Sequence, residues 1–93
     1  MSTEIDPNKV LRSFFGADGR LRQMPTKHAK LLVVLERLAQ EFAPGQRYTE
    51  KAVNETLLRF HEDFCTLRRH LVDYKLLARA SGEYWRLEPA AAQ

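Results

Sequence analysis

The sequence of 93 residues has few features of secreted, membrane or disulfide-bonded proteins. Its single cysteine, Cys65, excludes an intramolecular disulfide and fits a reducing compartment. No apolar run approaches the roughly 18 residues of a membrane-spanning helix, and the N-terminal residues lack the apolar core of a secretory signal. We therefore expect a cytoplasmic protein without a membrane span.

Groups of catalytic or metal-binding side chains are equally scarce. His61 and Cys65 are four residues apart, and this spacing requires that a nucleophile–base pair or a metal site be considered. However, His61 is expected to precede the helix that carries Cys65, and His70 lies about 140° farther around that helix. No second cysteine exists, and His28 is remote in the sequence. We expect no enzyme and no cofactor, with His61 hydrogen-bonded inside a turn.

The charge balance is only modestly positive, with a net charge of +3. The apolar share (44%) and the charged share (29%) are those of an ordinary folded domain. Arginine outnumbers lysine by ten to five, and arginine is the better residue for bidentate contacts with phosphate and guanine. A polyanionic partner is compatible with this composition, but the claim needs support from the arrangement of the elements.

The N-terminal half predicts two helices. Asp6 can cap a short helix that runs to about Phe15, with Phe14 and Phe15 buried against the domain's own core or against a dimer partner. Thr26 is the expected cap of a longer helix that ends at Phe42 and carries an apolar stripe. The stripe consists of Leu31, Val34, Leu35, Leu38 and Phe42.

The segment 20–37 is the most basic part of the chain, with five basic side chains and one acidic one. One interpretation is a solvated helix face, which is the commoner origin of such a pattern. The other is a flank that contacts phosphate, in which Lys27 and Lys30 would take part. The sequence leaves both interpretations open.

The second half predicts a helix pair. A short strand at Arg47 and Tyr48 precedes Thr49, which is the expected cap of a helix that ends at about Arg59. After a tight turn, Asp63 is expected to cap a second helix, residues 63–74. Its apolar stripe consists of Phe64, Leu67, Leu71 and Tyr74. The opposite face is centred on Arg69 and also carries Cys65, Thr66 and Asp73, with Arg68 and His70 on its flanks.

A hairpin is expected behind the helix pair, over residues 76–87, with Ser81-Gly82 as a two-residue turn. This turn pairs Ala80 with Glu83, Arg79 with Tyr84, Ala78 with Trp85, and Leu76 with Leu87. We expect the core face of the hairpin to consist of Leu76, Ala78, Trp85 and Leu87. The outer face would then consist of Arg79, Tyr84 and Arg86.

The predicted fold class is mainly α with a small β-hairpin, an α+β domain similar to a winged helix-turn-helix. It contains three core helices, a short N-terminal helix and a C-terminal two-stranded wing. The single domain is expected to span residues 6–87, with flexible tails at 1–5 and 88–93.

Three strings carry a family resemblance: FFGADGRLRQMP, PGQRYTEKAVNETLLRFHEDFCTLRRHLVDYKLL and GEYWRL. Together they resemble the prokaryotic domain-of-unknown-function 2087 family, from about Phe14 to Leu87. The resemblance implies a component of bacterial transcriptional regulators, in which such a domain accompanies recognised helix-turn-helix domains or acts as an accessory module. It implies no catalytic or ligand-binding residues.

The sequence therefore favours double-stranded DNA as the partner, with the helix at 63–74 in the major groove. The candidate DNA-binding residues are Thr66, Arg68, Arg69, His70, Arg79, Arg86, Lys27 and Lys30. A homodimer is expected, because two-fold regulators bind palindromic sites. The alternative is a protein-interaction or dimerisation module without direct DNA contact. Its support comes from the adjacent phenylalanines, the modest charge and the acidic residues beside the turn.

Overall fold

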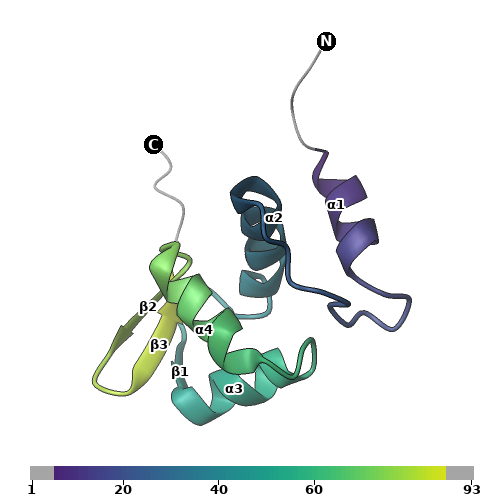
Figure 1. The fold of residues 1–93 in the computed structure, drawn as a ribbon. Helices are drawn as coiled ribbons and strands as arrows, with labels where there is room; N and C mark the ends of the chain where they lie inside the picture. The colour runs from purple at the N-terminus through teal and green to yellow at the C-terminus, as the bar shows by residue number, and fades with distance from the viewer. Residues whose placement is uncertain (1–5, 88–93) are drawn as a thin grey trace.

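The computed structural model describes residues 6–87, which form four helices and a small three-stranded antiparallel sheet (Figure 1). The helices are α1 (Pro7–Phe14), α2 (His28–Ala39), α3 (Glu50–Leu58) and α4 (Phe64–Asp73). The strands are β1 (Arg47–Thr49), β2 (Leu77–Ala80) and β3 (Glu83–Arg86). The α+β class and the order of elements agree with the sequence prediction, whereas the tails predicted at 1–5 and 88–93 lie outside the described residues.

Three of the four predicted helix caps are confirmed. The side chains of Asp6, Thr49 and Asp63 each accept a hydrogen bond from a backbone N–H in the first turn of α1, α3 and α4. The cap predicted at Thr26 is wrong, because the backbone stays extended for one more residue and the N-cap position falls on Lys27. No side chain caps α2 there.

The end of α2 also differs from the prediction, which placed it at Phe42. The helix ends at Ala39, and the next three N–H groups bond to carbonyls only three residues back, at Arg37, Leu38 and Ala39. Such bonds tighten the final turn and end the α-helical repeat. Phe42 nevertheless remains fully buried, so its predicted place in the core is correct.

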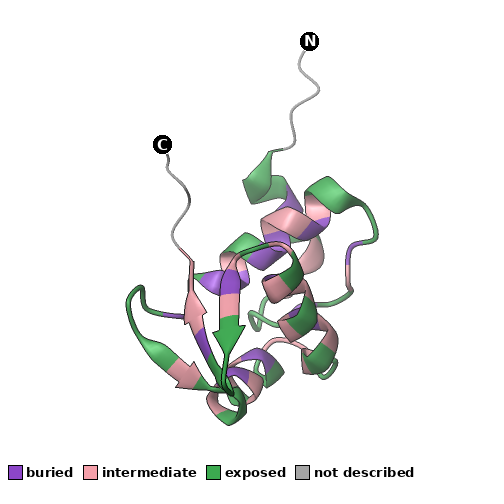
Figure 2. Cartoon of the chain, turned by 90° about the vertical axis from the view of Figure 1, so that its left-hand side faces the viewer, coloured by how far each residue is buried: buried purple, intermediate pink, exposed green. Residues whose placement is uncertain are grey.

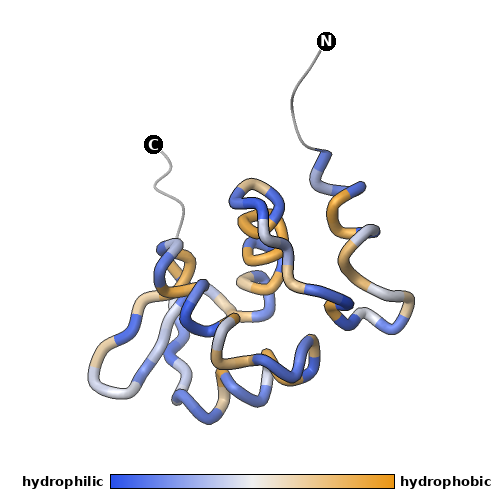
Figure 3. Tube along the Cα trace, viewed as in Figure 1, coloured by the Kyte–Doolittle hydropathy of each residue, from blue (hydrophilic) through white to orange (hydrophobic). Residues whose placement is uncertain are grey.

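The core lies where α2, α3, α4 and the sheet meet. The helix α2 contributes more buried residues than any other element and carries hydrophobic residues on successive turns (Figure 3). All five members of the predicted stripe are buried, four of them in α2 and Phe42 three residues beyond its end. The other helices and the strands add Val10, Val53, Leu57, Leu67, Leu71, Leu77 and Tyr84.

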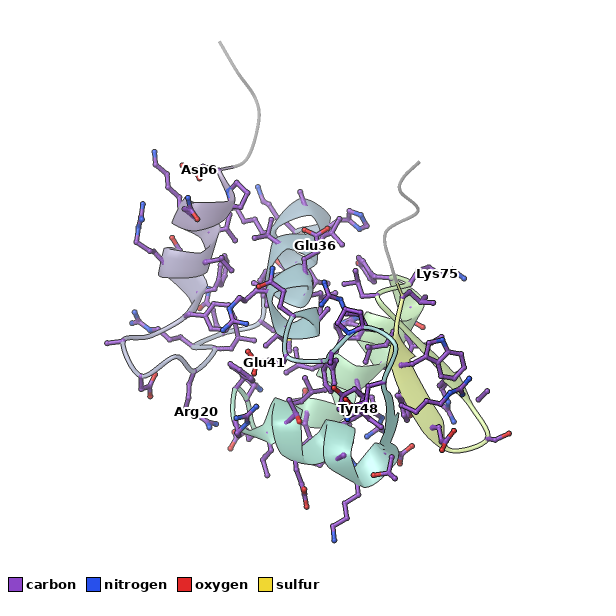
Figure 4. The ribbon with its side chains drawn as sticks, turned by 180° about the vertical axis from the view of Figure 1, so that it is seen from behind. Asp6, Arg20, Glu36, Glu41, Tyr48 and Lys75 are labelled. Atoms are coloured by element: carbon purple, nitrogen blue, oxygen red, sulfur yellow. The ribbon has the colours of Figure 1, made fainter. Side chains whose placement is uncertain are left out.

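The N-terminal segment is anchored at the end of α3. The guanidinium of Arg20, which is labelled in Figure 4, donates hydrogen bonds to the carbonyls of Leu58 and Arg59, at 3.2 and 2.9 Å. The Phe15 ring meets the Phe60 ring edge-on, with 6.4 Å between centroids. Phe14 and Phe15 pack against the core of this chain, which supports the first of the two interpretations of that pair.

The hairpin has the predicted turn and register, and β1 joins it as a third strand. The strand order is β1-β3-β2, and Ala80, Arg79 and Ala78 pair with Glu83, Tyr84 and Trp85. Both turn residues have positive φ, 53° at Ser81 and 79° at Gly82, which is the geometry of a type I′ turn. Along β2, burial decreases toward this turn (Figure 2).

The faces predicted for the hairpin are wrong. Tyr84 and Leu77 are buried to 1% exposure, whereas Trp85 is half-buried on the opposite face. The addition of β1 explains the reversal, because it sets Tyr48 beside Tyr84 on the inner face. On the outer face, the Arg47 guanidinium covers the Trp85 ring at 4.1 Å from its centroid. Each face carries an aromatic residue, so alternation alone did not identify the inner one.

Candidate nucleic-acid interface

The turn between α3 and α4 sets the position of α4. His61 Nδ1 accepts a hydrogen bond of 2.9 Å from the backbone N–H of Asp63, which confirms the expected bond within this turn. The Asp63 carboxylate in turn accepts from the Thr66 N–H at 3.3 Å and starts α4. Leu67 and Leu71 are fully buried, so the opposite side of the helix faces outward.

The outward side of α4 borders a cleft beside the hairpin. Cys65, Arg69 and Asp73 follow one another at four-residue intervals and are all exposed, which gives a ridge along the helix. Between this ridge and the hairpin lies a cleft of about 260 Å³. Its lining residues are Cys65, Thr66, Arg68, Arg69, Val72, Asp73, Arg79 and Tyr84. The fold thus brings together four of the predicted DNA-binding residues, three from α4 and one from β2.

The three arginines of this cleft differ in what holds them. Arg68 is half-buried and donates from Nη1 to Asn54 Oδ1 of α3. Arg79 is exposed, with its guanidinium carbon 5.8 Å from the centroid of the Tyr84 ring. Arg69 is exposed and has no hydrogen-bond or ion-pair partner within residues 6–87.

No carboxylate of the described chain lies within ion-pair distance of any of the three cleft arginines. The ion pairs among residues 6–87 all lie elsewhere: Arg37–Glu41, Arg47–Glu83 and Arg59–Glu41. Three cationic groups therefore share one concave surface, with Asp73 as the acidic side chain in the lining. Such an arrangement concentrates positive potential at this surface.

Tyr84 forms the inner wall of the cleft and joins β3 to α3. Its hydroxyl donates to Glu50 Oε1 at 3.0 Å. Burial raises the pKa of Tyr84 above its ordinary value, and the hydrogen bond to Glu50 raises it further. The charges of Arg79 and Arg68 act against this rise. The roles of Tyr84, Glu50 and Asn54 are not visible in the sequence, because these contacts join elements that are distant in the sequence.

The raised pKa of Tyr84 predicts a loss of stability at alkaline pH. The folded state retains the phenolic proton above the ordinary pKa of 10.0. The contribution of this proton to the stability of the fold is therefore complete below pH 10 and decreases as the pH rises toward the pKa of the folded state. We expect the free energy of unfolding to fall above pH 10, and less steeply in Tyr84→Phe, which cannot ionise. Urea denaturation followed by circular dichroism across this range measures both slopes, and identical slopes would contradict the prediction.

The remaining candidate residues of the second half lie away from the cleft. His70 packs edge-on against the Tyr74 ring, at 6.0 Å between centroids, and Tyr74 in turn stacks on His28 of α2 at 5.1 Å. Arg86 is half-buried and donates from Nη1 to the Phe42 carbonyl at 3.3 Å. Its predicted position on the outer face of the hairpin is therefore wrong, because β3 turns this face toward the core.

The basic side chains of segment 20–37 differ in their contacts. Arg20 (labelled in Figure 4) binds backbone carbonyls at the end of α3, and Arg37 forms an ion pair of 2.9 Å with Glu41. Lys27 and Lys30 line a separate shallow hollow beside the C-terminal end of α1, and share no cleft with the arginines of α4. Part of the segment's charge is thus used for internal contacts.

Within the described chain, no three histidine, cysteine or acidic side chains come close enough to hold a metal ion. Among residues 6–87, no helix is long and apolar enough to cross a membrane. Cys65 is exposed on α4, at the edge of the cleft.

Comparison with known proteins identifies a family. No curated protein and no solved structure matches the chain. One family model matches residues 20–86, which include everything from the Arg20 anchor through the helix pair to the last residue of β3. The match agrees with the resemblance seen in the sequence, and the chain belongs to the family described as uncharacterized protein conserved in bacteria, DUF2087.

Proposed function

We propose that this chain binds double-stranded DNA as a winged helix-turn-helix domain. In this proposal α4 enters the major groove and the β2–β3 hairpin lies beside it as the wing. The observation that carries the proposal is the cleft in which Arg68, Arg69 and Arg79 gather without a carboxylate partner in the described chain. Phosphate oxygens and base acceptors are the groups that such arginines bind in nucleic acid.

The dimensions and order of the elements support this proposal. The ten residues of α4 span about 15 Å, and a helix of about 10–12 Å diameter fits a major groove about 12 Å wide. Small side chains at Cys65 and Thr66 permit close approach to the bases. The helices α3 and α4 are followed by the β2–β3 hairpin, and β3 also pairs with β1, the strand that precedes α3. Winged helix-turn-helix domains use this order of elements.

The acidic residues near the start of α4 bear on how the helix would dock. Glu62 is exposed, and Asp63 uses its carboxylate to cap α4. Both would meet the phosphate backbone unfavourably if the N-terminus entered the groove first. We therefore propose that α4 docks by its middle turns, where Arg69 lies.

The other candidate role is a protein-interaction module without DNA contact. It has less support, because Phe14 and Phe15 pack on the core of the chain and Leu58 is the one large hydrophobic residue exposed in 6–87. An interface that excludes DNA would be expected to present a larger apolar patch. A homodimer on a palindromic site remains a prediction of the DNA-binding proposal.

Binding of labelled random-sequence duplex across a salt series tests the proposal. We expect fluorescence anisotropy to report binding at low salt, with an affinity that falls by about 0.9 log units per log unit of salt for each phosphate contact. Two to four contacts would give a slope of about 2 to 4. Absence of binding at the lowest salt would refute DNA binding and redirect the search to protein partners.

A further inference from the structure

Adjacent arginines of α4 differ in their freedom to reach a ligand, and this difference bears on how DNA would be read. Arg68 is half-buried and is hydrogen-bonded to Asn54 of α3, while Arg69 is exposed at the centre of the outward ridge. To contact a base, Arg68 would have to release Asn54. Arg69 has all of its donors available.

We infer that Arg69 is the residue that determines base specificity, and that it selects a guanine in the major groove. The inference rests on the proposed DNA binding. The fork of donors on an arginine matches the O6 and N7 acceptors of guanine, which is the commonest base-specific contact of proteins with DNA. One turn earlier on the same ridge, Cys65 leaves room for α4 to approach the base pair.

Arg68 is then a positioning residue. Its bond to Asn54 links α4 to α3 and sets the direction in which the neighbouring Arg69 projects. Arg79 is exposed on β2, across the cleft from α4, and its place over the Tyr84 ring suits it to a phosphate contact beside the groove. The three arginines thus have three separate roles, in base readout, positioning and backbone contact.

Selection of duplexes from a random library by the wild type, by Arg69→Ala and by Arg68→Ala tests this division. The two variants lose the same charge at neighbouring positions, so each is the matched control of the other. We expect the wild type to select a motif that contains a required G·C pair, and replacement of that pair by A·T to weaken binding about 5- to 150-fold. Arg69→Ala should accept both pairs equally, whereas Arg68→Ala should bind all duplexes more weakly but keep the preference.

A further variant, Asn54→Ala, removes the partner of Arg68 without a change in charge. It should weaken binding while leaving both the selected motif and the salt slope unchanged, and it replaces Arg68→Ala if circular dichroism shows that variant to be unfolded. An Arg69→Ala protein that selects the wild-type motif would overturn the inference, as would a wild type that binds duplex without any base preference. In both of these cases DNA binding itself would stand. A wild type that binds no duplex at all would overturn the two together.

Discussion

Replacement of Tyr84 by alanine is expected to destabilise the domain by about 3–5 kcal/mol, because truncation of a buried aromatic side chain leaves a cavity at the junction of sheet and helices. The variant also loses the hydrogen bond to Glu50. Domains of this size have a total unfolding free energy of about 5–15 kcal/mol, so this one change would remove a large part of it. Urea denaturation followed by far-ultraviolet circular dichroism gives the difference.

Trp85→Ala is the matched control for Tyr84→Ala, since it truncates the neighbouring aromatic residue on the opposite face of β3. Trp85 is half-buried, and its main partner is the Arg47 guanidinium. We expect a cost of about 1–2 kcal/mol from partial burial and the lost cation–π contact. A larger cost for Trp85→Ala than for Tyr84→Ala would mean that the hairpin faces are those expected from the sequence.

Reversal of two charges at the cleft is expected to have the largest effect on function. A protein with Arg69→Glu and Arg79→Glu should bind random duplex roughly 100-fold more weakly than the wild type, since two favourable contacts are replaced by repulsion from phosphate. Both side chains are exposed, so the fold should survive the changes. Fluorescence anisotropy at low salt measures the affinity.

The control for this experiment is the same change of net charge at another face, with Lys27→Glu and Lys30→Glu. These lysines line a separate hollow near α1. If α4 and the hairpin make the interface, the lysine variant should lose about tenfold or less through the general loss of positive charge. An equal or greater loss would shift the interface to the start of α2, where the sequence offered a phosphate-contacting flank.

Local signals in the sequence predicted much of the fold. The caps at Asp6, Thr49 and Asp63 and the turn at Ser81-Gly82 were predictable because each depends on residues within a few positions. The buried stripe of α2 follows from helical periodicity, which is equally local. The same periodicity predicted the stripe of α4, in which Leu67 and Leu71 are buried while Phe64 and Tyr74 are partly buried. The cap of α2 was misplaced by one residue because an extended backbone at Lys27 leaves no local signature.

The contacts that shape the candidate interface depend on residues far apart in the sequence. Arg68 meets Asn54, fourteen residues away, and Tyr84 meets Glu50, thirty-four residues away. The periodicity of α4 placed Arg68 and Arg69 near its outward side. Only the packing of α4 against α3 determines that Arg68 is hydrogen-bonded to Asn54 while Arg69 is exposed. The same applies to Arg86, whose partner is the carbonyl of Phe42.

The sequence by itself determined the element order, the helix-pair and hairpin turns, the register of the hairpin and the family. The tertiary structure alone decided which face of the hairpin is buried and which arginines share a cleft. The physical reason is that alternation in a strand defines two faces without saying which one is covered. That choice was made by β1, which pairs with β3 across a separation of more than thirty residues and sets Tyr48 beside Tyr84.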